Sequence, residues 1–434
     1  MKISSKTFNN YHIKELDRYI FNQKKCIHIL SDNTSHIESF QKISETLLLT
    51  PDKNIFSLIE ELENDYDLIV ITDLFELTDD IYNFFKIIRT KLTNDGKLLI
   101  TSVNPKWNKL IRLFEISGLK EDSKRRAYIH PVKINNIGRS LGFEIIQSYS
   151  RQIFPFSLLG FGKILNRIFE LFLLPLNLGI KNYIIFSHFN SEINKKSKSI
   201  IIPAKNEELN LIPLIERVPV FEEPYELIVI YGDSDDKTEE IALSLNKKFP
   251  NRNIIPKKQT KNGKANAVWE AVEASDHDLL AILDSDQSVD PETLTEFFEI
   301  IECGNADFVN GTRLIYPMEQ DAMRAINTVG NKIFQFLISL VIGQKLTDSL
   351  CGTKVFRKED IDKIYSWQKR MKSKDPFGDF DLIFSAAYSG NKILEYPVHY
   401  RARVYGETQI SRFRDGYKLI IYFLESFYYF NFSK

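Results

Sequence analysis

The sequence predicts an α/β fold with two domains. Three observations lead to this prediction: apolar runs alternate strictly with helical segments in the second half of the chain, a weaker alternation occupies the first half, and a polar stretch separates them. Strict alternation of strands and helices is typical of a parallel sheet covered on both faces. At 434 residues the chain is long enough for each half to bury its own core.

The polar stretch HFNSEINKKSKS (188–199) is basic and lacks apolar periodicity, as an exposed connection does. We therefore expect an N-terminal domain over 1–190, a linker over 191–198 and a C-terminal domain over 199–434 that ends in an amphipathic helix.

The expected strands follow in order. In the first half they are KCIHIL (25–30), YDLIVIT (66–72), GKLLITSV (96–103), FEIIQSYS (143–150) and NYIIFSHF (182–189). In the second half they are SIIIPA (199–204), YELIVIY (225–231), a strand near NIIP (253–256) and LLAIL (279–283), with helices expected from Leu209, Lys237 and Lys264.

Composition excludes some function classes. A formal net charge of −1 argues against nucleic-acid binding as the main role. Three scattered cysteines, Cys26, Cys303 and Cys351, suit a reducing compartment and form neither a disulfide framework nor a zinc site. The start MKISSKTFNN lacks the apolar core of a signal peptide, so we expect a cytoplasmic protein.

Three stretches are rich in large apolar residues, yet none reaches the roughly 18 to 20 apolar residues that span a membrane. They are 168–180, 331–346 and 417–430, and basic residues flank them. Two interpretations stay open: core helices, or helices that lie in a membrane interface.

Asp284 and Asp286 follow the apolar run Leu279 to Leu283 directly. Ligands gather beyond the carboxyl ends of strands in open α/β sheets. Adjacent carboxylates repel unless a cation lies between them, and Mg²⁺ on substrate phosphates commonly uses one or two carboxylates. Asp-x-Asp also fits a phosphatase nucleophile, and Asp290 with Pro291 fits a helix start.

The neighbouring motifs decide between these alternatives. IIPAKNEELN (201–210), GDSDDKT (232–238), NGKANAV (262–268), DSD (284–286) and NGTR (310–313) follow in order, nearly all at strand ends. Together they resemble a family-2 glycosyltransferase with the A-type nucleotide-sugar fold, over about residues 198 to 415. The later motifs TDSLCGTKVFRK (347–358), FGDFDLIFSAA (377–387) and YPVHYRARVYGETQISRFRDG (396–416) resemble the branch with polyprenyl-phosphate sugar synthases. A phosphatase places its aspartates on the first strand of the domain, whereas two strand-helix units precede them here.

The resemblance implies roles for individual residues on the donor side. Asp286 is expected to ligate a divalent cation, Mg²⁺ or Mn²⁺, and Asp284 to touch the cation or the ribose. The expected substrate-binding residues of the base, ribose and phosphate pocket are Pro203, Ala204, Glu207, Gly263 and Lys264. Glu207 and Lys264 also fit ordinary positions in the first turn of a helix.

Further residues are expected to serve the acceptor. Inverting transfer to a hydroxyl needs a carboxylate as general base, for which Asp348, Asp379 and Asp381 are the candidates, whereas an acceptor phosphate is already anionic. Arg313, Arg403 and Arg412 are expected to hold phosphates or an acceptor anion. A helix N-cap explains Asp379 and Asp381 equally, and a surface ion pair explains Arg313.

The sequence departs from the family pattern at two places. Tyr231 and Gly232 stand where many relatives carry two aspartates, so Asp233 is expected to supply the acidic contact to the base. Ser288 stands where polyprenyl-phosphate mannose synthases have a glutamine, which follows Asp286 immediately here as Gln287.

Residues 66–105 resemble the middle of a class I S-adenosylmethionine-dependent methyltransferase, and the likeness extends loosely over about residues 10 to 190. That family needs a glycine-rich turn after its first strand so that the backbone approaches the cofactor. This chain has IHILSDNTSHIES (27–39) at that point, without a glycine. We therefore expect a degenerate domain that does not bind S-adenosylmethionine, in which Asp73 and Glu76 face a substrate or cap a helix.

The leading hypothesis is a metal-dependent glycosyltransferase that moves a sugar from a nucleotide-sugar donor to a polyprenyl phosphate or another glycan precursor, as a cytoplasmic protein or peripherally at the cytoplasmic face of the membrane. Two alternatives are a bifunctional enzyme that also methylates a soluble glycan, and a non-catalytic nucleotide-binding scaffold. The intact NEE, NGK, DSD and NGTR set speaks against the scaffold.

Overall fold

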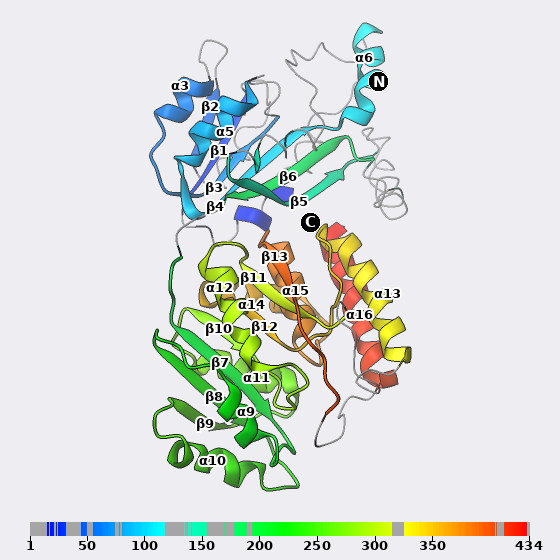
Figure 1. Cartoon of the computed structure of the whole chain (residues 1–434). Coiled ribbons are helices and arrows are strands. Elements are labelled where there is room, and N and C mark those ends of the chain that lie inside the picture. The colour runs from blue at the N-terminus through cyan, green and yellow to red at the C-terminus, as the bar shows by residue number, and fades with distance from the viewer. Residues whose placement is uncertain are drawn as a thin grey trace. The chain divides into compact units, whose positions relative to one another are not determined.

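The structure of the chain is a computed structural model (Figure 1). It describes residues 15–16, 18–20, 23, 25–31, 45–49, 55–73, 78, 80–117, 134, 138–139, 141–153, 169, 178–188, 193–314, 325–403, 405 and 412–431. The chain divides into two compact units. The N-terminal unit comprises Met1–Asn190, Tyr388–Gly390 and Tyr429–Lys434, and the C-terminal unit comprises Ser191–Ala387 and Asn391–Tyr428.

The N-terminal unit contains a six-stranded sheet in the order β2-β1-β3-β4-β6-β5. Strands β2, β1, β3 and β4 are parallel, and β6 runs antiparallel to both β4 and β5. The strands are β1 (Cys26–Ser31), β2 (Glu45–Leu49), β3 (Tyr66–Ile71), β4 (Leu92–Val103), β5 (Phe143–Arg151) and β6 (Lys181–His188). All five strands expected from sequence are present, and β2 is an additional one.

Strand β3 shows why apolar runs form the centre of this sheet. Ile69 and Ile71 belong to the apolar cluster on one face, while Leu68 and Val70 belong to the cluster on the other. A strand buried on both faces needs apolar residues at every position rather than at alternate ones. The described helices of the unit include α3 (Ile55–Glu60), α5 (Ile81–Arg89) and α6 (Asn108–Ile116), with a 3-10 turn at Pro105–Trp107.

Helix α5 covers one face of this sheet. Its buried residues Ile81, Phe84, Phe85 and Ile88 recur at helical spacing, so they form one apolar stripe. The backbone N–H of Asn83 donates a hydrogen bond to the Asp80 carboxylate, 3.1 Å away, which satisfies a free donor in the first turn.

The C-terminal unit contains a seven-stranded sheet in the order β13-β11-β12-β10-β7-β8-β9. Its strands are β7 (Lys198–Ala204), β8 (Tyr225–Tyr231), β9 (Ile254–Lys258), β10 (Leu279–Ile282), β11 (Phe308–Thr312), β12 (Lys354–Arg357) and β13 (Ile393–Pro397). Strands β10, β7, β8 and β9 are parallel, but β12 is antiparallel to both β10 and β11. The expectation of a wholly parallel sheet is therefore wrong at β12. This strand starts at the same edge of the sheet where β11 ends, so the chain returns along the sheet without first crossing to the other edge.

Helices cover both faces of this sheet. Helices α9, α10 and α12 pack on one face and share an apolar core with β7 and β8. Helix α11 also packs against β7 and β8, but its residues are not part of that core. The helices are α9 (Leu211–Arg217), α10 (Thr238–Lys248), α11 (Lys264–Ala274), α12 (Leu294–Glu302), α13 (Ala325–Ile342), α14 (Ile361–Arg370), α15 (Asp379–Tyr388) and α16 (Arg412–Asn431), with 3-10 turns at Pro291–Thr293 and Lys358–Asp360.

Helices α13 and α16 lie to the right of this sheet in Figure 1. The ring of Phe380 on α15 contacts both Phe334 of α13 and Tyr422 of α16, at centroid distances of 5.5 and 6.2 Å. Among the helices that the structure describes, none is long and apolar enough to cross a membrane. The apolar stretch 168–180 lies mostly outside the described residues.

Candidate active site

The predicted motifs meet at one edge of the C-terminal sheet. Strands β7, β8 and β10 run in the same direction, so Ala204, Tyr231 and Ile282 end at this edge. Strand β12 begins there, because its first residue Lys354 pairs with Ile282. The edge therefore gathers residues from segments far apart in the sequence.

Asp284, two residues beyond the end of β10, lies between a lysine and a glycine. Lys264 Nζ, at the first residue of α11, donates to Asp284 Oδ1. A Cβ atom added to Gly352 would lie 2.0 Å from Asp284 Oδ2. Burial alone raises the pKa of Asp284, but the charge and hydrogen bond of Lys264 outweigh burial and hold the pKa below its ordinary value.

Asp286 is buried, with 5% of its surface exposed, and faces different partners. Arg403 Nη2 lies 2.8 Å from Asp286 Oδ2, and the backbone N–H of Ser288 donates to Asp286 Oδ1 over 3.0 Å. Two carboxylates that are separated by one residue are thus neutralised by separate cations, Lys264 for Asp284 and Arg403 for Asp286.

Glu207 lies close to both aspartates. Its backbone N–H donates to Thr238 Oγ1, 2.8 Å away, and its carboxylate accepts a hydrogen bond from Asn210. Burial raises the pKa of Glu207 to about 7, against the hydrogen bond from Asn210, and the negative charge of Asp286 adds to the rise. A carboxyl group that titrates near neutral pH beside two aspartates is typical of a functional site.

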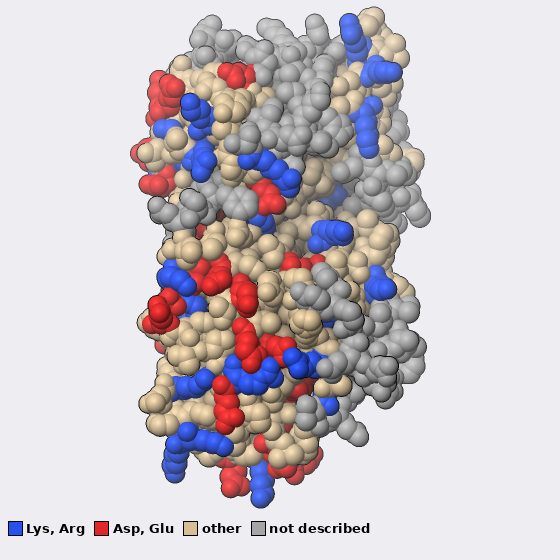
Figure 2. All heavy atoms as spheres, viewed as in Figure 1, with Lys and Arg blue, Asp and Glu red and all other residues tan. Residues whose placement is uncertain are grey.

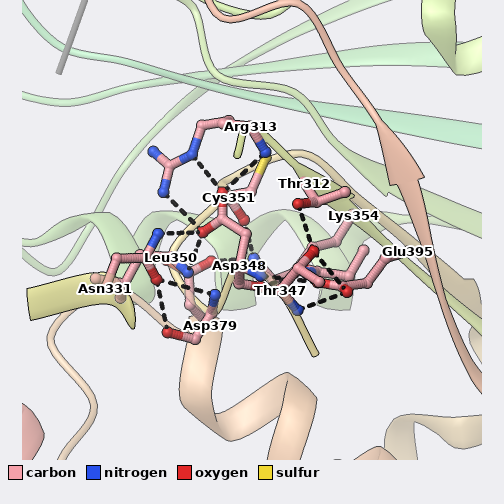
Figure 3. A network of polar contacts seen from close by, with 12 residues as sticks. Thr312, Arg313, Asn331, Thr347, Asp348, Leu350, Cys351, Lys354, Asp379 and Glu395 are labelled. Atoms are coloured by element: carbon pink, nitrogen blue, oxygen red, sulfur yellow. Dashed lines mark hydrogen bonds and ion pairs between the residues drawn. The ribbon is translucent and has the colours of Figure 1, made fainter. Parts of the chain in front are cut away.

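Asp348 anchors a second buried network, drawn in Figure 3. Arg313 binds it through Nε and Nη2, with N–O distances of 2.6 and 2.9 Å, and Asn331 Nδ2 donates over 2.7 Å. The backbone N–H groups of Arg313 and Leu350 also donate to it. Burial works to raise the pKa of Asp348, but the charge and hydrogen bond of Arg313 prevail and lower it to about 2. Asp348 is therefore a buried anion whose acceptor positions are occupied.

Asp379 and Asp381 stand in the first turn of α15 but face different partners. Asp379 Oδ1 lies 2.6 Å from Lys354 Nζ. Asp381 accepts hydrogen bonds from Tyr422 and from Gln368 Nε2, the latter over 2.9 Å. The alternative role of a helix cap belongs instead to Asp375, whose carboxylate accepts the backbone N–H groups of Phe377, Phe380 and Asp381.

The remaining candidates lie as follows. Pro203 and Ala204 end β7, and the Pro203 carbonyl accepts a hydrogen bond from Ser285 Oγ over 2.8 Å. Gly263 precedes α11 with a φ of 109°, a conformation that glycine adopts readily. Asp233 is mostly exposed, with 80% of its side chain accessible, and its nearest cation is Lys258 at 3.9 Å. Arg412 begins α16, but its side chain is outside the part of the chain that the structure describes.

Three residues of the site carry no clear signal in the sequence. Lys354 is fully buried, whereas a lysine normally predicts an exposed position. Gly352 matters through its contact with Asp284, which only the folded chain creates. Glu395 accepts the backbone N–H groups of Thr347 and Asp348 over 2.6 and 2.9 Å, and so supports the loop that carries Asp348.

The donor set of Asp284 and Asp286 fits a divalent cation that arrives with substrate. In the described ranges of the chain, no three acid, histidine or cysteine side chains converge to hold a metal ion by themselves. Mg²⁺ at nucleotide sites commonly takes one or two carboxylates, while phosphates and waters complete its shell. On the face seen in Figure 2, acidic and basic side chains are interleaved over the C-terminal unit.

Comparison with known proteins matches this half of the chain. Residues 199–365 match the family described as "Glycosyl transferase family 2". The dolichyl-phosphate hexose transferase of Haloferax volcanii is 28% identical over 218 residues, which cover 50% of this chain and 88% of the relative. The dolichol-phosphate mannosyltransferase of Pyrococcus furiosus is 26% identical over 219 residues, which cover 49% of this chain and 59% of the relative.

A solved structure, glucosyl-3-phosphoglycerate synthase from Mycobacterium tuberculosis in complex with UDP, aligns with a TM-score of 0.41 and 15% identity, over 54% of this chain and 80% of that chain. The family match and the two transferase relatives show that the chain is a glycosyltransferase with a family-2 domain.

Proposed function

We propose that this glycosyltransferase transfers a sugar from a nucleotide-sugar donor, held with Mg²⁺ or Mn²⁺ at Asp284 and Asp286, to a polyprenyl phosphate at a membrane surface. The names of the two relatives, a dolichyl-phosphate hexose transferase and a dolichol-phosphate mannosyltransferase, support this class of acceptor.

The donor side follows from the sheet edge. Asp286, and Asp284 beside it, would hold the cation, which would supply Lewis-acid stabilisation of the departing nucleoside diphosphate. Lys264 is a positive charge at the amino end of α11, so it attracts phosphate oxygens together with that helix end. Arg403 neutralises Asp286 and is available to bind the diphosphate once a cation takes its place on that carboxylate.

One observation carries the choice of acceptor: each of the three candidate bases is already committed to other groups. Asp348 is bound by Arg313, Asp379 by Lys354, and Asp381 by Tyr422 and Gln368. A hydroxyl acceptor requires a carboxylate that takes its proton, whereas a phosphate oxygen attacks as an anion. The arrangement therefore favours an acceptor that arrives negatively charged.

Helix α16 supports a membrane surface as the place of transfer. Its exposed apolar residues are spaced 3, 4, 7 and 11 positions from Tyr417 and so form one stripe: Tyr417, Ile420, Ile421, Leu424 and Tyr428. Leu419, Tyr422 and Phe423 of the same helix are buried. A core helix would bury its apolar residues, whereas an interfacial helix leaves a stripe exposed to enter the headgroup region. Ile333 and Phe336 of α13 are also exposed, at 55% and 61%.

The test combines liposome cosedimentation with a transfer assay. The full chain should sediment with vesicles of phosphatidylglycerol and phosphatidylcholine, and should transfer sugar to a short polyprenyl phosphate in the presence of Mn²⁺. Ile420→Glu with Leu424→Glu should abolish sedimentation. Leu243→Glu, which changes an apolar residue of α10 with 53% exposure, should not. A protein that ignores vesicles and glycosylates only soluble acceptors would refute the proposal.

For the N-terminal unit, the proposal is a degenerate class I methyltransferase-type domain without cofactor. The strand order, with one antiparallel strand next to the edge, supports this type of fold. At the carboxyl end of β3, Lys181 Nζ lies 3.2 Å from the carboxylate of Asp73. An ion pair at a strand end where a cofactor is bound in such folds supports loss of that function.

A further inference from the structure

Lys354 is the least expected charged residue near the candidate active site. Its side chain is fully buried, and Nζ donates to the Cys351 carbonyl and lies 2.6 Å from Asp379 Oδ1. An ammonium group in such a place is stable only when its hydrogen bonds and charge are satisfied, as these two partners achieve.

The Cys351 carbonyl belongs to a turn that lies against β11 and against the loop that follows β10. On one side, Cys351 Sγ would lie 2.6 Å from a Cβ added to Gly311 of β11. On the other side, Gly352 borders Oδ2 of Asp284. The turn thus lies between β11 and Asp284. Lys354 Nζ links the Cys351 carbonyl of this turn to Asp379 of α15.

We infer that Lys354 is a positioning residue for sugar transfer, which holds the Cys351–Gly352 turn against Asp284 and thereby fixes where that carboxylate meets the donor. The inference rests on the proposed role of Asp284 in donor binding. Lys354 touches neither Asp284 nor a reacting atom in the contacts described, so it acts through the turn.

The arrangement of charged residues around Lys354 is consistent with this positioning role. Asp379 lies beside Lys354, and Asp284 lies beside Lys264, so two ion pairs stand next to each other at the sheet edge. The charge of Lys354 also lowers the pKa of Asp284, and the charge of Asp379 also raises that of Lys264. Loss of Lys354 would leave Asp379 buried without its cation and the turn without its anchor.

The chain contains a matched control at the opposite end of the sheet. Lys198, the first residue of β7, is 1% exposed, and its Nζ donates to the Lys196 carbonyl over 2.8 Å and to Glu302 over 2.7 Å. Like Lys354, Lys198 is buried and binds one carbonyl and one buried carboxylate, and it also pairs with Glu223 at 2.9 Å. It lies at the amino end of β7, away from Asp284.

The experiment compares Lys354→Met, Lys354→Arg and Lys198→Met in the full chain. Melting temperature, kcat and KM for sugar transfer, and calorimetric binding of GDP or UDP with Mn²⁺ are measured. Both methionine variants should melt at lower temperature, because each removes an ammonium group that pairs with a buried carboxylate. Only Lys354→Met should lose about 100-fold in kcat and bind the Mn²⁺–diphosphate more weakly, the scale expected when a reacting group is displaced by about 1 Å.

If Lys354→Met does not fold, Lys354→Arg provides the test. Lys354→Arg retains the charge and should recover at least part of the activity relative to a variant without it. Folded Lys354→Met with kcat and diphosphate binding within about threefold of wild type would overturn the inference, as would an equal loss in Lys198→Met. If wild type binds a diphosphate but transfers no sugar, the proposed function fails, while the binding comparison still decides the role of Lys354.

Discussion

Gly352 borders the carboxylate of Asp284 so closely that a methyl group on its Cα would come within 2.0 Å of Oδ2. No real Cβ occupies such a distance, so either the turn or the carboxylate must move. The relationship makes Gly352 a spatial requirement for the position of Asp284 at the sheet edge.

Gly352→Ala is therefore expected to lower sugar transfer by about 100-fold, because it displaces Asp284 from its place beside Lys264. Steady-state kinetics with saturating Mn²⁺ measure the effect. Gly416→Ala is the control, since a Cβ at Gly416 in α16 meets nothing within 4 Å. Activity of Gly352→Ala equal to that of the control would show that the contact does not constrain Asp284.

Asp286→Asn keeps the shape of the side chain and removes its charge. Transfer should fall by several orders of magnitude, the scale reached when a few kcal/mol of transition-state charge stabilisation are lost. The assay is release of product nucleotide with increasing Mn²⁺. Near-normal turnover of this variant at saturating Mn²⁺ would remove Asp286 from the metal site.

Asp348→Asn should destabilise the C-terminal unit by about 3–5 kcal/mol, because it leaves the buried guanidinium of Arg313 without its anion. Denaturant unfolding at neutral pH measures the loss. The double variant Asp348→Asn, Arg313→Met removes both charges and should recover part of it. A single variant as stable as wild type would contradict the structural role.

The same carboxylate should contribute to acid unfolding. Its pKa in the folded protein is about 2, below the ordinary value of 3.8 for an aspartate. A depressed carboxyl pKa gives stability that is present above 3.8 and is lost as the pH falls towards 2. Asp348→Asn should therefore show a shallower loss of stability than wild type in this acid range.

Glu207 should make donor binding depend on pH near neutrality. Its pKa of about 7 lies above the ordinary value of 4.5, so the carboxyl group is largely protonated below pH 7 in the free protein. A cation bound at Asp286 favours the charged form of Glu207, so binding should release protons and become tighter as the pH rises through 7. Calorimetry of Mn²⁺–GDP or Mn²⁺–UDP in buffers of different ionisation enthalpy detects the protons. Glu207→Gln should flatten the dependence, and an unchanged profile would exclude Glu207 as its source.

The N-terminal unit should not bind S-adenosylmethionine, because the segment after β1 reads SDNTS and lacks the glycines that let the backbone approach this cofactor. Calorimetric titration of the full chain is expected to show no saturable heat. Micromolar binding would mean that a turn without glycine accommodates the cofactor, and would favour the bifunctional alternative.

The strands of the fold could be predicted from the sequence because a strand buried on both faces is a continuous run of apolar residues. The run Leu279 to Leu283 contains β10, and the runs that contain β7 and β8 are equally continuous. Strand β12 gave no such signal. It carries Lys354 and Arg357, whose charges are satisfied by distant residues such as Asp379 and Asp307.

The directions of site residues were harder to predict than their positions. Asp379 and Asp381 are two apart on a helix, so their side chains point to different sides, and they bind Lys354 and Tyr422 respectively. Asp233 follows β8 as expected, yet its side chain is largely exposed. The sequence pattern predicts which residues follow the end of a strand. It does not predict which way their side chains point, because the residues that bind those side chains are distant in the sequence.

Residues Tyr429–Lys434 group with the N-terminal unit although they end the chain. There, Arg151 Nη2 donates to the Phe430 carbonyl over 3.2 Å, and the Arg18 guanidinium lies 5.7 Å from the centre of the Phe430 ring. The N-terminal unit is consequently built from segments that are not continuous in the sequence. A fragment of residues 1–190 expressed alone would lack Phe430 and its contacts with both arginines, so it would lack part of the N-terminal unit.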